Sequence, residues 1–487
     1  MEQVSLVWAR LRALAASNYA LYLLPSIVQG GAALLLLVPV TTYFLDPEDF
    51  GVFALVVAIT IPVKAFAATG AQWVIGGNYF HVAEAERRTL LFNVLAVDLA
   101  LRSLLILLIY LMGETILQSV VTEYQPVYLD YLHLALAATW AGSLWPTVSF
   151  LFTVQGHPKR FALISLIQIA VNVVTTVICL AVLGLGVESL FFALLVTNLI
   201  SLIFEVAIIR HSVAFSLKMR WLREILKTGM LATPGGLAEM ASNMADKIVI
   251  QRFVGIGALG LYSHSLLYQA IFKMFTSALS NTLTPHSLQI FSRDLDRTSL
   301  ERALAAWYGM LALMGVGVAL FADGLVTLLT HGKFTASASL VPIWYLLVFS
   351  TAHGIPYATF LMARKRNRAL MYTQLVPTLA GIGLIMAGAY YYGIVGAAWA
   401  IVTTGVVIQA ARRWAAWRAG CRSIAEQAFV EALVIYLAAW ILDGLFHWSF
   451  WMETAVFVAA VPLLILRFKL VSGLASILSF EKSDTSH

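Results

Sequence analysis

The sequence is poor in charged residues and almost free of cysteine. Charged residues make up 11% of the 487 residues, against roughly 25% in soluble domains, so most of the chain is not built to face water. Cys179 lies in an apolar run and Cys421 in a basic loop. Two cysteines so placed exclude a disulfide framework and a cysteine-based metal site, and no cofactor is expected.

Catalytic motifs are also missing. The sequence has no phosphate-binding glycine loop, no zinc-ligand spacing and no nucleophile motif. The longest loop opposite the basic loops, about residues 113–128, is too short to fold as a catalytic domain. We therefore expect a protein that is not an enzyme. The basic loops do not indicate nucleic-acid binding, because their alternation with apolar runs accounts for them.

Long apolar runs fill the chain instead. Hydrophobic residues make up 61% of the sequence, and the mean hydropathy is +0.86. At about twenty residues per crossing, the runs predict an all-α polytopic membrane protein with about fourteen transmembrane helices. The predicted spans lie near residues 22–45, 51–73, 90–112, 130–154, 161–183, 187–209, 228–252, 258–284, 303–329, 337–362, 369–391, 393–411, 425–446 and 451–470.

The loops between these spans separate by charge. Lysine and arginine collect on the cytoplasmic side of membrane proteins, and 25 of the 31 fall in alternate loops or at the ends of the chain. The opposite loops are acidic, as in residues 46–49. This pattern predicts a multi-pass membrane protein with both termini in the cytoplasm. The predicted cytoplasmic groups are Arg10 and Arg12, Arg87 and Arg88, Lys159 and Arg160, five residues from Arg210 to Lys227, three from Arg293 to Arg302, four from Arg364 to Arg368, four from Arg412 to Arg422, and Arg467, Lys469 and Lys482.

Rare residues recur at an offset of 209 positions. A proline opens one apolar run, a glycine opens the next, and a lysine lies inside that second run, all features that a bilayer restricts. The recurrence predicts two pseudo-symmetric six-helix lobes, the build of many transporters. The aligned residues are Pro25, Phe44, Gly51 and Lys64 with Pro234, Phe253, Gly260 and Lys273. The predicted parts are an N-lobe (1–210), a cytoplasmic linker (211–227), a C-lobe (228–411), and helices 13 and 14 with a cytoplasmic tail (412–487).

Charged residues inside the spans are the candidate functional groups, because a charge within the bilayer needs water or a partner. Lys64 and Lys273 occupy equivalent places in the second helix of each lobe. Tyr262, Gln269 and Lys273 follow helical spacing and predict one polar face. We expect that face to line a wet cavity.

Two further groups of charges allow two interpretations each. Asp98 and Arg102 have the spacing of an intrahelical ion pair, which either locks its helix or takes part in binding. One helical face carries Glu239, Asn243 and Asp246, with Lys247 beside them. This group is either a proton or cation relay or a packing cluster whose charges neutralise one another. Acids near span ends are expected to reach the membrane interface and have no assigned role. These are Glu205, Asp323 and Asp443.

The run LVPVTTYFLDPEDFGVFAL is similar to the first hairpin of bacterial polysaccharide flippases, and IVIQRFVGIGALGLYS is similar to their helix 7 to helix 8 signature. This resemblance implies a location in the bacterial cytoplasmic (inner) membrane. The basic turns GHPKRF and ARKRNRAL fit the same plan, and the resemblance covers about residues 15–415. The family is the O-antigen and exopolysaccharide lipid-carrier flippases of the multidrug, oligosaccharidyl-lipid and polysaccharide exporter superfamily.

The resemblance implies a cargo and roles. Such proteins carry an undecaprenyl-diphosphate-linked oligosaccharide from the cytoplasmic to the periplasmic leaflet by alternating access. The diphosphate would contact Lys64, Arg102 and Lys273, and the sugars would contact Asn243, Tyr262 and Gln269. An ion-coupling network of Asp98, Glu239, Asp246 and Lys247 would use H⁺ or Na⁺. Besides membrane lipids, the expected partners are a glycan polymerase and export machinery, and nucleic acid is not among them.

Three other interpretations stay open at this point. A lipid II flippase is the first, because such flippases of the same superfamily have fourteen spans. A drug or cation antiporter is the second, although an acidic cavity would suit it better than three basic residues. The third is a non-transporting membrane scaffold for glycan-assembly enzymes, which would depend on basic loops such as 364–368 rather than on Lys64 and Lys273.

Overall fold

The computed structural model describes residues 18–79, 82–210 and 212–470, and over these ranges the chain is helical and has no β-strand. Each predicted span falls on one or two helices. The first part of the chain contains α2 (Asn18–Ala32), the π-helical turn η1 (Ala33–Leu37), α3 (Val38–Phe44), α4 (Pro47–Asn78), α5 (Glu84–Val120), α6 (Val127–Ala141), α7 (Trp145–Gln155), α8 (Pro158–Val177), the π-helical turn η2 (Ile178–Val182) and α9 (Glu188–Ile209).

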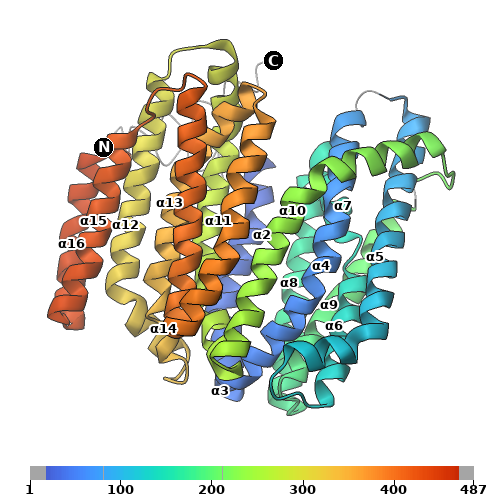
Figure 1. Cartoon of the computed structure of the whole chain (residues 1–487), viewed down its shortest axis with the longest axis horizontal. Coiled ribbons are helices and arrows are strands. Elements are labelled where there is room, and N and C mark those ends of the chain that lie inside the picture. The colour runs from blue at the N-terminus through green and yellow to red at the C-terminus, as the bar shows by residue number, and fades with distance from the viewer. Residues whose placement is uncertain (1–17, 80–81, 211, 471–487) are drawn as a thin grey trace. The chain divides into compact units, whose positions relative to one another are not determined.

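The rest of the described chain is equally helical, and Figure 1 labels most of its elements. They are α10 (Met219–Phe253), α11 (Ile256–Arg293), α12 (Thr298–Leu329), the short 3₁₀ helix η3 (Thr335–Ser337), α13 (Leu340–Ala363), α14 (Asn367–Arg418), α15 (Glu426–Phe446) and α16 (Phe450–Arg467).

The number of membrane crossings depends on how the longest helices are counted. Among the described residues, ten helices are long and apolar enough to cross a membrane. One of them, α14, bends at Gly393, whose φ is 60°, so its 52 residues cover two predicted spans. The helices α4, α10 and α11, of 32, 35 and 38 residues, are not among the ten. The protein is a polytopic membrane protein, and the count of fourteen stays a prediction.

The duplication is visible in the ends of the helices. α3 ends at Phe44 and α4 begins at Pro47. α10 ends at Phe253 and α11 begins at Ile256, so both boundaries repeat at the offset of 209 positions seen in the sequence. The helix ends therefore confirm the repeat that the rare residues predicted.

The predicted linker, residues 211–227, is only partly a loop, because α10 begins at Met219. Trp221 and Ile225 are buried in a cluster with residues of α4, α5 and α7, whereas Arg220 and Arg223 are exposed. This stretch is an amphipathic helix, which the count of apolar residues alone missed. In Figure 1, α10 runs across the ends of its neighbours before it turns along α4.

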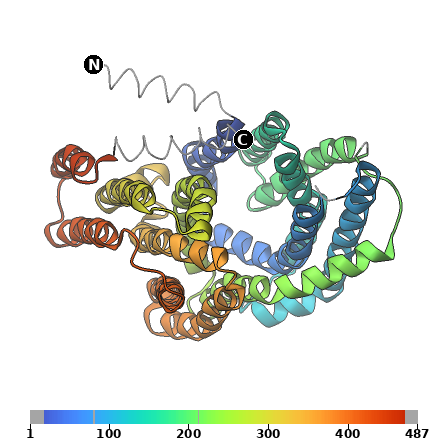
Figure 2. The ribbon, with the colours of Figure 1, turned by 90° about the horizontal axis from the view of Figure 1, so that it is seen from above.

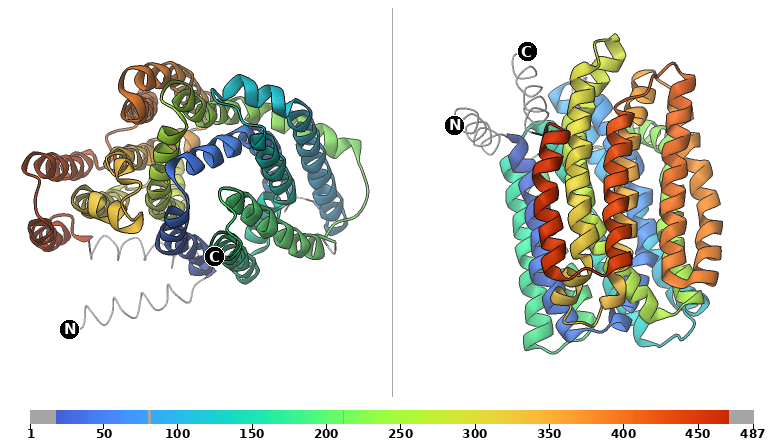
Figure 3. Two further views of the ribbon diagram at one scale, coloured as in Figure 1. Left: turned by 90° about the horizontal axis from the view of Figure 1, so that it is seen from below. Right: turned by 90° about the vertical axis from the view of Figure 1, so that its left-hand side faces the viewer.

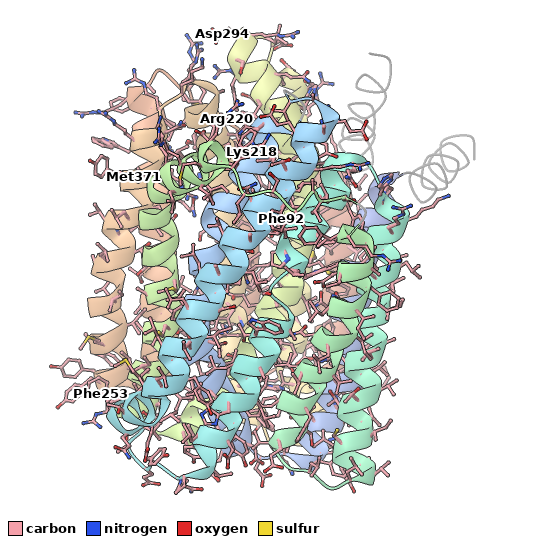
Figure 4. All side chains as sticks on the ribbon, turned by 90° about the vertical axis from the view of Figure 1, so that its right-hand side faces the viewer. Phe92, Lys218, Arg220, Phe253, Asp294 and Met371 are labelled. Carbon is pink, nitrogen blue, oxygen red and sulfur yellow. The ribbon has the colours of Figure 1, made fainter. Side chains whose placement is uncertain are left out.

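The loop before α10 is fixed to α5 by one asparagine. The Nδ2 of Asn93 donates to the carbonyl oxygen of Ser216 (2.7 Å), and its Oδ1 accepts from the backbone N–H of Lys218 (2.9 Å). Figure 4 shows Lys218 and Arg220 at one end of α10 and Phe253 at the other. The basic end of α10 is thereby attached to the beginning of α5, where Glu86 accepts from Arg220 at 3.0 Å.

The described residues divide into two compact units. One holds residues 18–263 and 385–397, and the other holds residues 264–384 and 398–470. The division passes through α11, and α10 belongs to the same unit as α4, against which it packs. The four-part division of the chain at residues 210, 227 and 411 stays a prediction.

The unit of residues 264–384 and 398–470 has an aromatic core. Trp307 and Tyr308 of α12, Tyr345 of α13 and Tyr436 of α15 are fully buried there. The hydroxyl of Tyr345 donates to the carbonyl oxygen of Leu311 (2.6 Å), so a buried phenol keeps a partner. α12 contacts both α15 and α16, and these three helices lie side by side in Figures 2 and 3. The two C-terminal helices are therefore attached through α12.

Candidate functional site

The unit of residues 18–263 contains a polar cavity of about 590 Å³. Its walls come from α2, α4, α5, α6, α7, α8 and α9, and α8 contacts both α2 and α9 (Figure 2). In a chain this apolar, so many hydrogen-bonding groups around one space are the main sign of a functional site. The polar lining residues are Gln29, Thr60, Arg102, Thr139, Ser165, Gln168, Asn172, Thr197 and Asn198.

Helical spacing explains how α8 supplies one wall. Ser165, Gln168 and Asn172 stand three and four residues apart, so they lie on the same face of the helix. All three line the cavity. Amides and hydroxyls both donate and accept hydrogen bonds, which suits a hydroxyl-rich ligand.

A break between α6 and α7 shapes the opposite wall. α6 ends at Ala141 and α7 begins at Trp145. A Cβ at Gly142 would lie 2.8 Å from the Nδ2 of Asn198, so a larger residue would displace that amide. The Nδ2 of Asn198 donates to the carbonyl oxygen of Ala138 at 2.8 Å. Gly142 thus lets α9 approach the end of α6 and fixes Asn198 at the cavity.

Arg102 provides the positive charge of this site. Its Nε donates to the Oδ1 of Asp98 at 3.0 Å, and the two side chains are 3% and 2% exposed. The intrahelical ion pair predicted from their spacing is therefore confirmed. Among the residues that the structure describes, the Nη2 of Arg102 has no hydrogen-bond partner. An unsatisfied, buried guanidinium nitrogen costs free energy, which an anionic ligand oxygen would recover.

A chain of polar groups leads from the cavity into α9. The Nε2 of Gln168 donates to the Oγ of Ser201, and that hydroxyl donates to the Oε1 of Glu205. Glu205 is fully buried, so the prediction that it reaches the membrane interface is wrong. The sequence contains a signal for this arrangement, because the four-residue spacing of Thr197, Ser201 and Glu205 puts them on one face of the helix.

Asp246, Lys247 and Tyr262 form a second cluster, in which the sequence predicted Lys247 beside Asp246 but not the contact with Tyr262. The Tyr262 hydroxyl donates to the Oδ2 of Asp246 (2.9 Å), and the Nζ of Lys247 lies 3.1 Å from its Oδ1. The same Nζ donates to the carbonyl oxygen of Asn243 (2.8 Å). Tyr262 is fully buried, so in this structure it lines no open cavity. Its role in sugar binding stays a prediction.

The other predicted site residues are less closely connected. Gln269 is buried and Lys273 is exposed on α11, and Asn243 is exposed on α10. Lys64 lies on α4 and Glu239 on α10, but their side chains lie outside the described residues. The pairing of Lys64 with Lys273 therefore stays a prediction. Within the described ranges, no group of three or more metal-ligating side chains comes together.

The fold defines a class of protein. Over 94% of this chain and 96% of the other, the structure is similar to "Lipid II flippase MurJ, inward closed conformation", with a TM-score of 0.66 and 15% identity. It is also similar to an inward-facing "multidrug resistance MATE family transporter of the MOP superfamily", over 86% of this chain and 98% of the other, with a TM-score of 0.63 and 15% identity. The chain has the fold of these membrane proteins.

The sequence identifies the family. Residues 40–339 match the family described as "Polysaccharide biosynthesis protein", and since that match covers more than half of the chain, the protein belongs to this family. A relative, "Succinoglycan biosynthesis transport protein ExoT" of Rhizobium meliloti (strain 1021), is 22% identical over 405 residues, which cover 81% of this chain and 78% of the relative.

Proposed function

We propose that this protein is a lipid-carrier flippase. It moves an undecaprenyl-diphosphate-linked oligosaccharide, an exopolysaccharide or O-antigen repeat unit, from the cytoplasmic to the periplasmic leaflet by alternating access. Family membership supports a role in polysaccharide biosynthesis. The relative named as a succinoglycan biosynthesis transport protein supports transport of a glycan, and the fold shared with a lipid II flippase supports a lipid-linked cargo.

The polar cavity of residues 18–263 is the observation that carries this proposal. Amides from α2, α8 and α9 surround it, and Arg102 lines it. A glycan presents many hydroxyl groups that exchange hydrogen bonds with amides, and a diphosphate presents oxygens that a guanidinium contacts with high affinity. One membrane-embedded space therefore offers partners for both polar parts of the cargo, while the polyprenyl tail stays in the lipid.

Three positively charged side chains contact the diphosphate in different ways. Arg102 contacts a phosphate oxygen through Nη2 while Nε stays bound to Asp98. Lys64 and Lys273, at equivalent positions of the repeat, add point charges for the diphosphate. Asn243, Tyr262 and Gln269 contribute sugar contacts once the helices rearrange.

We further propose coupling to H⁺ or Na⁺. Carboxylates within the membrane are the groups that exchange protons or bind sodium in transporters. The network expected from the sequence consists of Asp98, Glu239, Asp246 and Lys247. We add Glu205, because it is buried at the end of the series of hydrogen bonds that begins at Gln168. Exchange of the ion would reset the transporter for the next cargo.

Mass spectrometry of lipid-linked sugars tests the proposal. Cells that lack the protein are complemented with wild type, with Arg102→Gln, or with Lys64→Ala plus Lys273→Ala, and expression in the membrane is measured for each. We expect an oligosaccharide diphospholipid to accumulate on the cytoplasmic leaflet, and to be cleared by wild type but not by the variants.

The other outcomes identify the alternatives. Accumulation of lipid II would assign the cargo to peptidoglycan synthesis. No accumulation, with increased drug sensitivity, would indicate a drug or cation antiporter. Full rescue by both variants, with loss of function on changing Arg364 and Arg366, would indicate a scaffold for glycan-assembly enzymes.

A further inference from the structure

A second cavity lies in the unit of residues 264–384 and 398–470, at the junction of α13, α14 and α15. Its volume is about 790 Å³. The loop from Ala419 to Ala425, between α14 and α15, forms one side of it. The lining residues that matter below are Tyr357, Arg413, Trp414, Trp417, Arg422 and Glu426.

Five arginines, called here the arginine cluster, gather at this end of the unit. Arg413 and Arg422 line the cavity, and Arg418 stacks over the ring of Trp414 at 4.5 Å. Cys421 also lines the cavity, and its thiol lies close enough to Arg297 and Arg364 to interact electrostatically with both. Two carboxylates oppose them, since Arg364 pairs with Asp294 and Arg413 pairs with Glu426. The arginine cluster therefore keeps an excess of positive charge.

One arginine is held in place and two are available. Glu426 accepts from the Nη2 of Arg413 (2.5 Å) and from the hydroxyl of Tyr357 (2.7 Å). The same hydroxyl accepts from the backbone N–H of Ile424 (3.3 Å), which fixes the loop. Within the described part of the chain, Arg418 and Arg422 form no ion pair. The cavity thus has a rigid wall and one lining arginine, Arg422, that is able to take a ligand, while Arg418 lies beside it over the ring of the lining Trp414.

The other wall is aromatic. Trp414 and Trp417 stand three residues apart on α14 and are 54% and 67% exposed. Tryptophan is enriched where a membrane meets water, because its ring is apolar and its N–H is polar. The charge pattern of the loops places this end of the helices on the predicted cytoplasmic side. A ligand that fills the cavity and touches both walls is anionic at one end and apolar at the other.

We propose that this cavity binds the phosphate headgroup of an anionic phospholipid. Arg418 and Arg422 donate hydrogen bonds to the phosphate, and Trp414 and Trp417 pack against the glycerol and the first acyl carbons. Basic pockets between transmembrane helices on the cytoplasmic side are suited to such headgroups. Topology alone explains why arginines occur at this end of the helices, but it does not require Arg413 and Arg422 to line one cavity together with two exposed tryptophans.

Lipid titration of the purified full-length protein tests the site. Delipidated protein in detergent is titrated with phosphatidylglycerol or phosphatidylcholine, and bound lipid is counted by native mass spectrometry. We expect phosphatidylglycerol to bind more tightly than phosphatidylcholine. Each arginine removed should weaken its binding roughly fivefold, so Arg418→Gln plus Arg422→Gln should weaken it about twenty-fivefold. Trp414→Leu should weaken both lipids.

Lys159→Gln plus Arg160→Gln is the matched control, because it removes two predicted cytoplasmic charges from the other unit. Size-exclusion chromatography checks the folding of each variant, and Arg422→Gln alone replaces the double variant if that one aggregates. Equal weakening by the control, or equal binding of both lipids, would overturn the site. Displacement of the lipid by millimolar inorganic phosphate would assign it to a soluble anion instead.

Discussion

Gly51 of α4 and Gly260 of α11, equivalent residues of the two repeats, bring the beginnings of these helices into backbone contact. A Cβ on Gly51 would overlap the carbonyl oxygen of Ile256, and a Cβ on Gly260 would overlap that of Pro47 and approach the N of Gly51 to 3.0 Å. Ile256 and Pro47 are themselves equivalent across the offset of 209 positions. The contact is reciprocal, as a local two-fold relation between repeats requires.

Gly260→Ala should weaken this crossing. The new methyl group meets backbone atoms, which no change of side-chain rotamer relieves, so we expect destabilisation by about 1–3 kcal/mol. A thermal unfolding assay on detergent-purified protein measures it. Gly383→Ala is the control, because a Cβ there meets nothing within 4 Å. An unchanged midpoint for Gly260→Ala would mean that the helices do not cross at these residues.

The ion pair on α5 predicts a non-additive pair of substitutions. Asp98→Asn leaves the Arg102 guanidinium buried without a counter-charge and should cost about 3–5 kcal/mol. Asp98→Asn plus Arg102→Gln removes both charges and should recover much of that loss. Denaturant unfolding of Asp98→Asn, of Arg102→Gln and of the double variant measures the coupling. Additive losses would contradict a direct pair.

The same double variant separates structure from function. If Arg102 only locks α5, transport should recover together with stability. If Arg102 also holds the diphosphate, or Asp98 also couples the ion, the double variant should be stable and still fail to clear the lipid-linked oligosaccharide. The second result is the one that the cavity-lining position of Arg102 predicts.

The sequence predicted the helices well, because an apolar run must form a helix to span a bilayer. The pairing of Phe44 with Phe253 predicted where α3 and α10 end. Pro25 lies inside α2, however, and Gly51 lies inside α4, so these two residues do not mark helix ends. What it missed was Met219, where an amphipathic stretch with three basic residues began α10. A rule based on mean hydropathy cannot detect a helix that is half polar.

The site was harder to predict, for a physical reason. Charges stand out in an apolar sequence, so Asp98, Arg102, Asp246 and Lys247 were found, and the structure pairs them as Asp98 with Arg102 and Asp246 with Lys247. Uncharged amides such as Gln168 do not stand out, although four of them line the cavity. Their importance depends on which helices pack together, and only the structure shows that.

Cys421 should react with maleimide in an unusual pH profile. Burial raises the pKa of its thiol to about 11, and only the thiolate reacts. In a Cys179→Ser background, the labelling rate of folded protein should therefore rise about tenfold per pH unit between pH 7 and pH 10. Protein unfolded in detergent should instead level off above its ordinary pKa of 9.0. A plateau near pH 9 in the folded protein would contradict a buried thiol.

Tyr262→Phe decides between the two interpretations of the cluster on α10. The substitution removes the hydrogen bond to Asp246, a carboxylate that keeps Lys247 as its ion-pair partner. Hydrogen bonds to charged groups are worth about 1.5–3 kcal/mol, so a packing cluster should lose that much stability and keep transport of the folded fraction. A sugar contact or ion relay should lose the same stability and should also slow the clearance of the lipid-linked sugar by the folded fraction. Tyr390→Phe, at an exposed tyrosine of the same unit, is the control for loss of a hydroxyl group. Because Tyr262 is fully buried against Asp246 and the proposed function uses both groups, we expect the loss of stability together with slowed clearance.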